Sequence, residues 1–245
     1  MKRLTSVQIE KIKELTKSGK SLNYISKKLG INKTTVYYHF LKIKGRTNIK
    51  PDFRFKNDKE LGEIIGIFVG DGSLSYVQKR YGYQVRVHFG RCNINYMRYV
   101  KPLFEKSFGK KFIAKSDGNN GIILETSSKD IFNFFFGYLD FDRHHKSTTV
   151  RLKPHKYSDL FIFGFLKGLI DTDGTICETK NGRGMAFYTS SKELKNQFCD
   201  IMNKISIHHG VSEDKRKGKN INYHVYIFRR DINKLISIVN PWKGQ

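Results

Sequence analysis

Cysteine, acidic residues and long apolar runs are all scarce in this chain of 245 residues. Its three cysteines, Cys92, Cys177 and Cys199, match no disulfide or zinc spacing, so we expect free thiols in a reducing compartment. No apolar run approaches the roughly 20 residues that a membrane-spanning helix needs. The first residues, MKRLTSVQIEKIKEL, are amphipathic rather than typical of a secretory signal. We therefore expect a cytoplasmic protein that is neither secreted nor bound to a membrane.

The shortage of acid leaves a large positive charge. Lysine and arginine number 46 against 22 aspartates and glutamates, so the formal net charge is +24. Basic side chains that replace the counterions of phosphates gain affinity, and the charge therefore indicates a polyanionic partner such as nucleic acid. The eight histidines include two adjacent pairs whose side chains point apart, and no zinc site is expected.

Residues 1–47 show the pattern of three short amphipathic helices. Ser21 suits a helix N-cap, Gly30 a helix end, and Asn32 the cap of the third helix. Helix, short glycine-containing turn, helix is the layout of a helix-turn-helix, so we predict a small all-α domain of that kind. A plain helical bundle or a protein-docking domain is the alternative. The apolar residues lie three or four apart, at Ile9, Ile12, Leu15, Leu22, Ile25, Leu29, Val36, Phe40 and Ile43.

The third helix of this domain would be the recognition helix, with its N-terminal residues in a major groove. Residues 1–50 carry 11 lysines and two arginines against two glutamates, which agrees with contact to DNA. The candidate DNA-binding residues lie off the apolar stripe, and they are Lys33, Thr34, Thr35, Tyr38 and His39.

Residues 48–60, NIKPDFRFKNDKE, have no periodicity and are predicted to be a linker. Two similar runs of elements follow. The first has a helix near residues 60–69, an alternating strand over 81–89, a helix over 93–108, a hairpin around DGNNG and a helix over 129–139. The second has a helix near 160–172, a hairpin around NGRG, a helix over 192–205, a basic stretch EDKRKGKN, a strand from 221 and a helix over 231–239.

The two runs share a register. Gly66 and Gly168 lie 102 residues apart, and so do Asp71 and Asp173. Matched glycines, matched acids and matched element order predict a duplicated α/β unit, with halves at residues 61–148 and 149–245.

Asp71 and Asp173 each follow an apolar helix, where the negative end of the helix dipole disfavours a carboxylate. If the two helices pack together, the acids converge and repel unless a cation lies between them. Mg²⁺ binds such sites through one or two carboxylates together with phosphates and water. Gly66 and Gly168, each in mid-helix at a cost of roughly 1 kcal/mol, are expected at a close helix interface. The pair of acids therefore predicts a metal site that acts on a phosphodiester.

The stretches IIGIFVGDG (64–72) and LKGLIDTDG (166–174) resemble the two namesake motifs of the LAGLIDADG homing endonucleases, in the single-chain form. The first motif departs at its sixth position, where Val69 replaces an acid that is not the metal ligand of the family. The resemblance implies an α+β fold of two pseudo-symmetric αββαββα units, whose sheets form a saddle over DNA. It also implies Mg²⁺-dependent cutting of both strands with 3′ overhangs.

The resemblance further implies the residues of the site. Metal would be held by Asp71 and Asp173, with Gly70 and Thr172 directly before them as further candidates. The family places basic residues at the ends of the second and fourth strands of each half. By position these are Arg91 and Lys129 in the first half, and Arg230 with Lys192, close to Ser190, in the second. Because the second half lacks a basic residue at the second-strand end, uneven cutting of the two strands is an open alternative.

Polar side chains on one face of the predicted strands suit contact with base edges and phosphates. A merely solvated face is the alternative for each residue. The candidates are Gln84, Arg86 and His88 in the first half, and Tyr188, His224 and Tyr226 in the second.

These patterns together predict a monomeric, site-specific endonuclease for double-stranded DNA, with Mg²⁺ or another divalent cation such as Mn²⁺ as cofactor. The helix-turn-helix would extend the DNA contact through avidity or serve autoregulation. Two alternatives stay open at this point. One is a DNA-binding regulator on the same fold that no longer cuts, and the other is an RNA-binding intron maturase.

Overall fold

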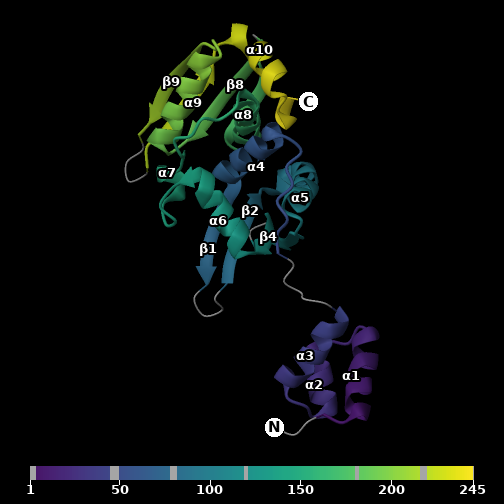
Figure 1. The fold of residues 1–245 in the computed structure, drawn as a ribbon. Helices are drawn as coiled ribbons and strands as arrows, with labels where there is room; N and C mark the ends of the chain where they lie inside the picture. The colour runs from purple at the N-terminus through teal and green to yellow at the C-terminus, as the bar shows by residue number, and fades with distance from the viewer. Residues whose placement is uncertain are drawn as a thin grey trace. The chain divides into compact units, whose positions relative to one another are not determined.

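The structure is a computed structural model that describes residues 4–44, 50–77, 82–118, 121–179, 182–215 and 220–244. The chain divides into two compact units, Met1–Ile49 and Lys50–Gln245, and Figure 1 shows the elements of both. No helix in the described residues is long and apolar enough to cross a membrane.

The N-terminal unit consists of three short helices around a small core. Ile12, Ile25 and Val36, one from each helix, are fully buried. Gly30 ends the second helix in the left-handed conformation, at φ 62°, and the Asn32 side chain accepts a hydrogen bond from the Thr34 backbone N–H at 3.0 Å. The predicted helical N-terminal region is therefore confirmed. Its helices are α1 (Ser6–Lys17), α2 (Leu22–Leu29) and α3 (Lys33–Lys44).

The larger unit contains the predicted repeat of helix, hairpin, helix, hairpin and helix. The first half comprises α4 (Asp58–Asp71), β1 (Gly72–Val77), β2 (Gly82–Phe89), α5 (Ile94–Phe108), β3 (Ile113–Ser116), β4 (Ile122–Ser127) and α6 (Lys129–Tyr138). The second comprises α8 (Asp159–Asp173), β7 (Gly174–Thr179), β8 (Gly182–Thr189), α9 (Lys192–Lys204), β9 (His209–Asp214), β10 (Asn222–Ile227) and α10 (Arg229–Val239). Each half forms a four-stranded antiparallel sheet, in the orders β1-β2-β4-β3 and β7-β8-β10-β9. The α+β fold class with two αββαββα units is confirmed.

Alternation along the strands places each sheet over the core. In β2, Val85, Val87 and Phe89 are buried, whereas Gln84 and His88 point to the other face. Met185 and Phe187 are the buried residues of β8 in the same arrangement. One face of each sheet is therefore left free of the core, as the period of two residues requires.

Helices α4 and α8 lie side by side between the two sheets (Figure 1). A Cβ placed on Gly66 would overlap the Phe165 carbonyl oxygen and lie 3.0 Å from the Gly168 Cα. One placed on Gly168 would meet the backbone N of Ile67 and the carbonyl oxygen of Glu63. Backbone therefore packs directly on backbone, and only glycine fits at both positions.

Two more glycines extend this contact at the other end of the helices. A side chain on Gly62 would overlap the Phe161 carbonyl oxygen, and one on Gly164 would overlap that of Lys59. These four glycines bring the C-terminal ends of α4 and α8 together and so set the geometry of the site.

The structure differs from the prediction of a linker over residues 48–60. Residues 58–60 already belong to α4, and residues 52–55 dock on the first half. The Asp52 N–H donates to the Phe108 carbonyl at 3.0 Å, and the Phe53 ring stacks on Phe134 at 5.3 Å between centroids. The alternating phenylalanines of PDFRF explain the docking, because both rings contact Phe108 of α5 and Phe134 of α6. Residues 48 and 49 lie outside the described part of the chain.

Four further elements differ from the prediction. Strand β9 begins before the basic stretch EDKRKGKN and includes the first two residues of that stretch. The sequence of β9 shows no apolar alternation, so the pattern did not predict this strand. Between the halves lie β5 (Leu139–Asp140), α7 (Lys146–Thr149) and β6 (Arg151–Leu152), none of which was predicted. The expected boundary between residues 148 and 149 falls inside α7.

Candidate active site

Two carboxylates meet where the paired helices end. Asp71 is the last residue of α4 and Asp173 the last of α8. Gly70 lies against the other helix, since a Cβ there would overlap the Thr172 hydroxyl and lie 3.1 Å from the Asp173 carboxylate. The absence of a side chain at Gly70 therefore lets the two helix ends, and with them the two acids, approach.

A cleft of about 630 Å³ opens over this pair. Asp71 and Asp173 line it, together with residues from both sheets and from the segment between the halves. The lining includes Ser73 and His88 of the first sheet, Tyr188, Ser190 and Asn222 of the second, and Arg143, His144 and Lys146 from between them.

Burial and mutual repulsion disfavour the charged form of the acids. Burial raises the pKa of Asp71 from 3.8 to about 7, and the charge of Asp173 adds to the rise. Burial also raises the pKa of Asp173, while Lys146 and Lys243 act in the opposite direction. Raised carboxylate pKa values in a cleft are typical of functional sites, and a ligand with positive charge would relieve the repulsion.

Two lysines that sequence reasoning missed lie on the same helix ends. The Lys146 ammonium donates to the carbonyl oxygens of Phe68, Gly70 and Gly72 at 3.0, 3.2 and 2.6 Å. It thereby satisfies the C-terminal carbonyls of α4, where a cation also suits the helix dipole. Burial lowers the Lys146 pKa to about 8, and the two aspartates oppose this shift.

Lys243 occupies the equivalent place in the second half. Its ammonium donates to the carbonyl oxygens of Thr172 and Gly174 at 3.0 and 2.7 Å. Thr172 and Gly174 are the repeat partners of Gly70 and Gly72, so each aspartate has one lysine beside it. No sequence signal marked these lysines, because they follow the last helix of each half and lie 97 rather than 102 residues apart.

The donor set of this site is oxygen. Within the part of the chain that the structure describes, no group of three or more His, Cys, Asp or Glu side chains could hold a metal. Two carboxylates with nearby backbone carbonyls fit Mg²⁺, which typically takes one or two carboxylates and completes its shell with water and phosphate. They do not fit zinc, whose structural sites use cysteine and histidine.

Comparison with known proteins agrees with this fold. Residues 160–236 match the family model described as LAGLIDADG-like domain. The homing endonuclease I-DmoI, in complex with its target DNA and in the presence of Mg, is 18% identical with a TM-score of 0.58 over 75% of this chain and 96% of that chain. The homing endonuclease I-WcaI, bound to its DNA recognition sequence, is 14% identical with a TM-score of 0.53 over 78% of this chain and 84% of that chain. The larger unit has the LAGLIDADG homing endonuclease fold.

A further relative extends over the N-terminal unit as well. An uncharacterized protein of Methanocaldococcus jannaschii is 23% identical over 238 residues, which is 93% of this chain and 81% of that protein. The resemblance that the two motifs predicted is therefore confirmed as a shared fold and, for the second half, as a LAGLIDADG-like domain.

Two predicted basic residues lie away from the aspartates. Gly72, next to Asp71, pairs with Val87, whereas Ser127, just before Lys129, pairs with Gln84. That offset is three strand residues, or about 10 Å, in the direction away from the acid. Lys129 instead lies over the Tyr83 ring at 5.7 Å. The resemblance implied that the fourth strand ends near the metal site, but β4 ends at the other end of the sheet from Asp71.

Arg230 is displaced in the same way in the second half. Gly174, next to Asp173, is level with Phe187 and Val225, and Arg230 follows five residues beyond Val225. Its guanidinium is exposed and lies 3.8 Å from the Asp231 carboxylate. Lys129 and Arg230 therefore lie away from the two aspartates, whereas Lys146 and Lys243 reach the helix ends that carry them.

The other two predicted basic residues lie at the correct end of the strands. Lys192 begins α9 with an exposed side chain, and Ser190, two residues earlier, lines the cleft. Arg91 begins a short 3-10 turn (Arg91–Asn93) directly after β2. The Arg91 side chain lies outside the described part of the structure.

The first sheet presents its predicted polar residues on the free face. The Arg86 Nε donates to the Glu125 carboxylate at 2.8 Å, and its terminal nitrogen donates to the Gln84 side chain. His88 lies 2.8 Å from the Ser73 hydroxyl and lines the cleft. Burial lowers the His88 pKa, and the positive charges of Arg86 and Lys146 lower it further. Arg86 is therefore oriented by neighbours that the sequence pattern did not pair with it.

The free face of the second sheet is aromatic. Tyr188 and His224 are cross-strand partners with ring centroids 4.8 Å apart, and Tyr226 is 45% exposed beside them. In the N-terminal unit, Lys33, Thr34 and Tyr38 are exposed, while Thr35 and His39 are half-buried. The Lys42 ammonium lies 4.6 Å from the Tyr38 ring centroid.

Proposed function

We propose that this protein is a site-specific endonuclease that hydrolyses phosphodiester bonds in both strands of a DNA duplex. The observation that carries the proposal is the convergence of Asp71 and Asp173, one from each half, in the lining of a single cleft. One chain supplies an acid from each of two pseudo-symmetric halves, so a monomer has a centre for each strand.

Asp71 and Asp173 would hold divalent cations, Mg²⁺ or Mn²⁺, through their carboxylate oxygens. Bound metal supplies activation of a water and stabilisation of the attacking and leaving oxygens. I-DmoI has been solved with DNA in the presence of Mg, Ca and Mn, which supports the choice of a divalent cation.

The lysines would act on the phosphate. Lys146 and Lys243 each hold an ammonium at the C-terminal end of one motif helix, next to one aspartate. An ammonium there offsets the charge of the scissile phosphate, whose approach to two buried carboxylates is otherwise repulsive. With a pKa of about 8, Lys146 is mainly protonated at neutral pH and can carry out this role.

Sequence recognition would come from the free faces of the sheets. Arg86 and Gln84 suit hydrogen bonding to base edges, and Tyr188 and Tyr226 suit apolar contact with thymine methyl groups. The N-terminal unit would add a second DNA contact through α3, where Lys33 at the start of the helix and Tyr38 in its middle are exposed.

A DNA-binding regulator that does not cut is the second candidate, and the three-helix N-terminal unit with its exposed α3 favours it. A library of random DNA duplexes distinguishes the two. We expect Mg²⁺ to yield cut products at a shared sequence, with no products in its absence. Enriched binding without cutting at any metal concentration would overturn the endonuclease and support the regulator.

Substitution then tests the site. Asp71→Asn and Asp173→Asn should abolish double-strand cutting and leave DNA binding largely intact. Asp159→Asn is the matched control, because Asp159 lies on α8 but is exposed and forms a surface ion pair with Lys204. Linearisation of a target plasmid by either site variant would refute the assignment of the aspartates.

A further inference from the structure

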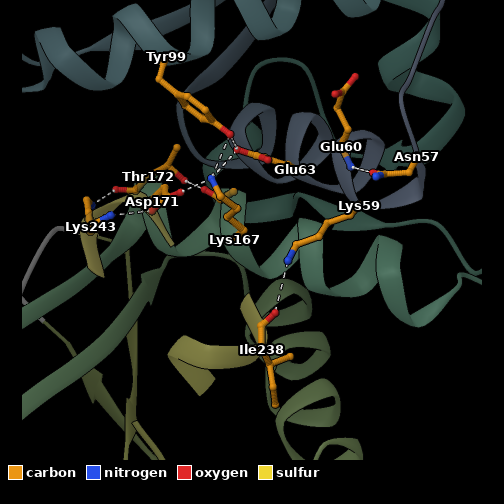
Figure 2. A network of polar contacts seen from close by, with 11 residues as sticks. Asn57, Lys59, Glu60, Glu63, Tyr99, Lys167, Asp171, Thr172, Ile238 and Lys243 are labelled. Atoms are coloured by element: carbon orange, nitrogen blue, oxygen red, sulfur yellow. Dashed lines mark hydrogen bonds and ion pairs between the residues drawn. The ribbon is translucent and has the colours of Figure 1, made fainter. Parts of the chain in front are cut away.

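A buried ionic network connects the two motif helices beside the site (Figure 2). The Lys167 ammonium lies 2.6 Å from the Glu63 carboxylate of α4 and 3.1 Å from the Asp171 carboxylate of α8. The Tyr99 hydroxyl donates to Glu63 at 2.7 Å. The Asp171 side chain has no exposed surface, and those of Glu63 and Lys167 are 8% and 9% exposed. Charges so deeply buried are retained only where they are paired.

The same network holds the segment that carries Lys243. The second carboxylate oxygen of Asp171 accepts a hydrogen bond from the Lys243 backbone N–H at 3.1 Å. Trp242 stacks on the Tyr99 ring, with centroids 5.0 Å apart. Both ends of the network therefore contact the 3-10 turn Trp242–Gly244, from which the Lys243 ammonium reaches the Thr172 and Gly174 carbonyls.

Among the residues that the structure describes, the first half has no equivalent network. In the 102-residue register, Ile65 and Val69 stand where the second half has Lys167 and Asp171. Lys146 is instead presented by α7, whose segment is closed locally by the Asp142 N–H donating to the Thr149 hydroxyl at 3.0 Å. The two lysines thus make similar contacts but are positioned by different means.

We infer that Asp171, oriented by Lys167, is a positioning residue for Lys243, and that it serves the centre of Asp173 selectively. The inference rests on the endonuclease function proposed above. Its consequence is an asymmetry between the two strands. Loss of the Asp171 contact frees the turn that carries Lys243, whereas Lys146 keeps its place beside Asp71.

The experiment measures cleavage of each strand separately, on a target duplex labelled on one strand or the other. Asp171→Asn keeps the size of the side chain but removes its charge. We expect it to slow cleavage of one strand about tenfold or more, because small misplacements of a catalytic group cost that much. A supercoiled target plasmid should then accumulate as nicked circles.

Three comparisons identify the cause. Lys243→Met should slow the same strand, and Lys146→Met the other strand. The double variant of Asp171→Asn and Lys243→Met should be no slower than Lys243→Met alone, since the aspartate acts through the lysine. The matched control Asp159→Asn, also on α8 but exposed, should cut both strands at the wild-type rate.

A readout independent of cleavage accompanies these rates. Trp242 is the single tryptophan of the chain, so its fluorescence reports the turn directly. Asp171→Asn should shift the Trp242 emission to the red and increase its quenching by acrylamide, while Lys146→Met leaves both unchanged. If Asp171→Asn fails to fold by circular dichroism, Trp242→Phe tests the same turn, because it weakens the stack on Tyr99 without removing a buried charge.

Equal slowing of both strands, additive losses in the double variant, or unchanged Trp242 fluorescence would overturn the inference while leaving the endonuclease function intact. A wild-type protein that binds its target but cuts neither strand would overturn both. Strand-selective loss together with a changed Trp242 signal would support the positioning role of Asp171.

Discussion

Neutralising Asp71 should stabilise the metal-free protein at neutral pH. The pKa of this carboxyl is about 7 in the folded state, against 3.8 for an aspartate that is not buried. An acid with a raised pKa holds its proton more tightly in the folded chain than in the unfolded one. The free energy of unfolding therefore falls as the pH rises from about 4 to about 7. Asn at this position carries no charge, so the Asp71→Asn variant escapes that loss.

The size of the effect follows from the linkage. Each pH unit between the two pKa values changes the free energy of unfolding by about 1.4 kcal/mol. From pH 5 to pH 7 the full slope would give about 2.7 kcal/mol, and partial ionisation of the folded carboxyl near pH 7 reduces this to roughly 2 kcal/mol. Lys146, with a pKa of about 8, stays protonated over most of this interval and contributes little.

Urea unfolding at pH 5 and pH 7, without divalent metal, measures the difference. Trp242 fluorescence reports the larger unit, because its ring packs against Tyr99 there. The advantage of Asp71→Asn over the wild type should grow by roughly 2 kcal/mol between the two pH values. Titrating groups that do not interact with Asp71, including His88, are present in both proteins and cancel in this comparison.

Urea unfolding in the presence of Mg²⁺ is a second test. Mg²⁺ should stabilise the wild type at pH 7 and have much less effect on Asp71→Asn, because a ligand that binds only the folded state stabilises it. An advantage of Asp71→Asn that stays constant or shrinks between pH 5 and pH 7 would refute the raised pKa. Equal stabilisation of both proteins by Mg²⁺ would refute the metal site at this carboxylate.

Three further expectations concern packing and domain structure. Lys167→Met should lower the free energy of unfolding by about 3–5 kcal/mol in urea titration, since two buried carboxylates lose their cation. Gly66→Ala should destabilise by about 1–3 kcal/mol or more through overlap with the Phe165 carbonyl, whereas Gly137→Ala, with open space around it in α6, should be neutral or stabilising. Deletion of residues 1–49 should leave a folded, metal-dependent core by circular dichroism and weaken binding to the target duplex, and loss of folding would contradict the domain boundary.

The repeat allowed the two acids and the helix interface to be predicted from the sequence alone. Asp71 and Asp173 lie at the same position of two matched motifs, and Gly66 and Gly168 recur at the same offset. These features are local patterns, since the helix period and the in-register spacing place them before any tertiary contact is known. The strand faces followed for the same reason, because alternation in β2 requires only the period of two residues.

The basic side of the site was decided by packing. Lys146 and Lys243 reach the motif helices across 74 and 69 residues of sequence to the carbonyls of Gly72 and Gly174. Their spacing does not follow the repeat, so no pattern connects them. Lys129 and Arg230 follow the repeat at an offset of 101. The strand register nevertheless places both at the end of their sheets that lies away from the aspartates.

The contrast has one physical reason. A helix or strand determines where its own side chains point, and the repeat therefore defined the aspartates, the glycines and the free faces of the sheets. A long lysine side chain is placed by the carbonyls and carboxylates that surround its ammonium, and those groups come from elsewhere in the chain. The motifs alone predicted the acids of this site. The lysines beside the acids take their places only when α4 and α8 have packed. The same holds for the Glu63–Lys167–Asp171 network, which orients one of these lysines.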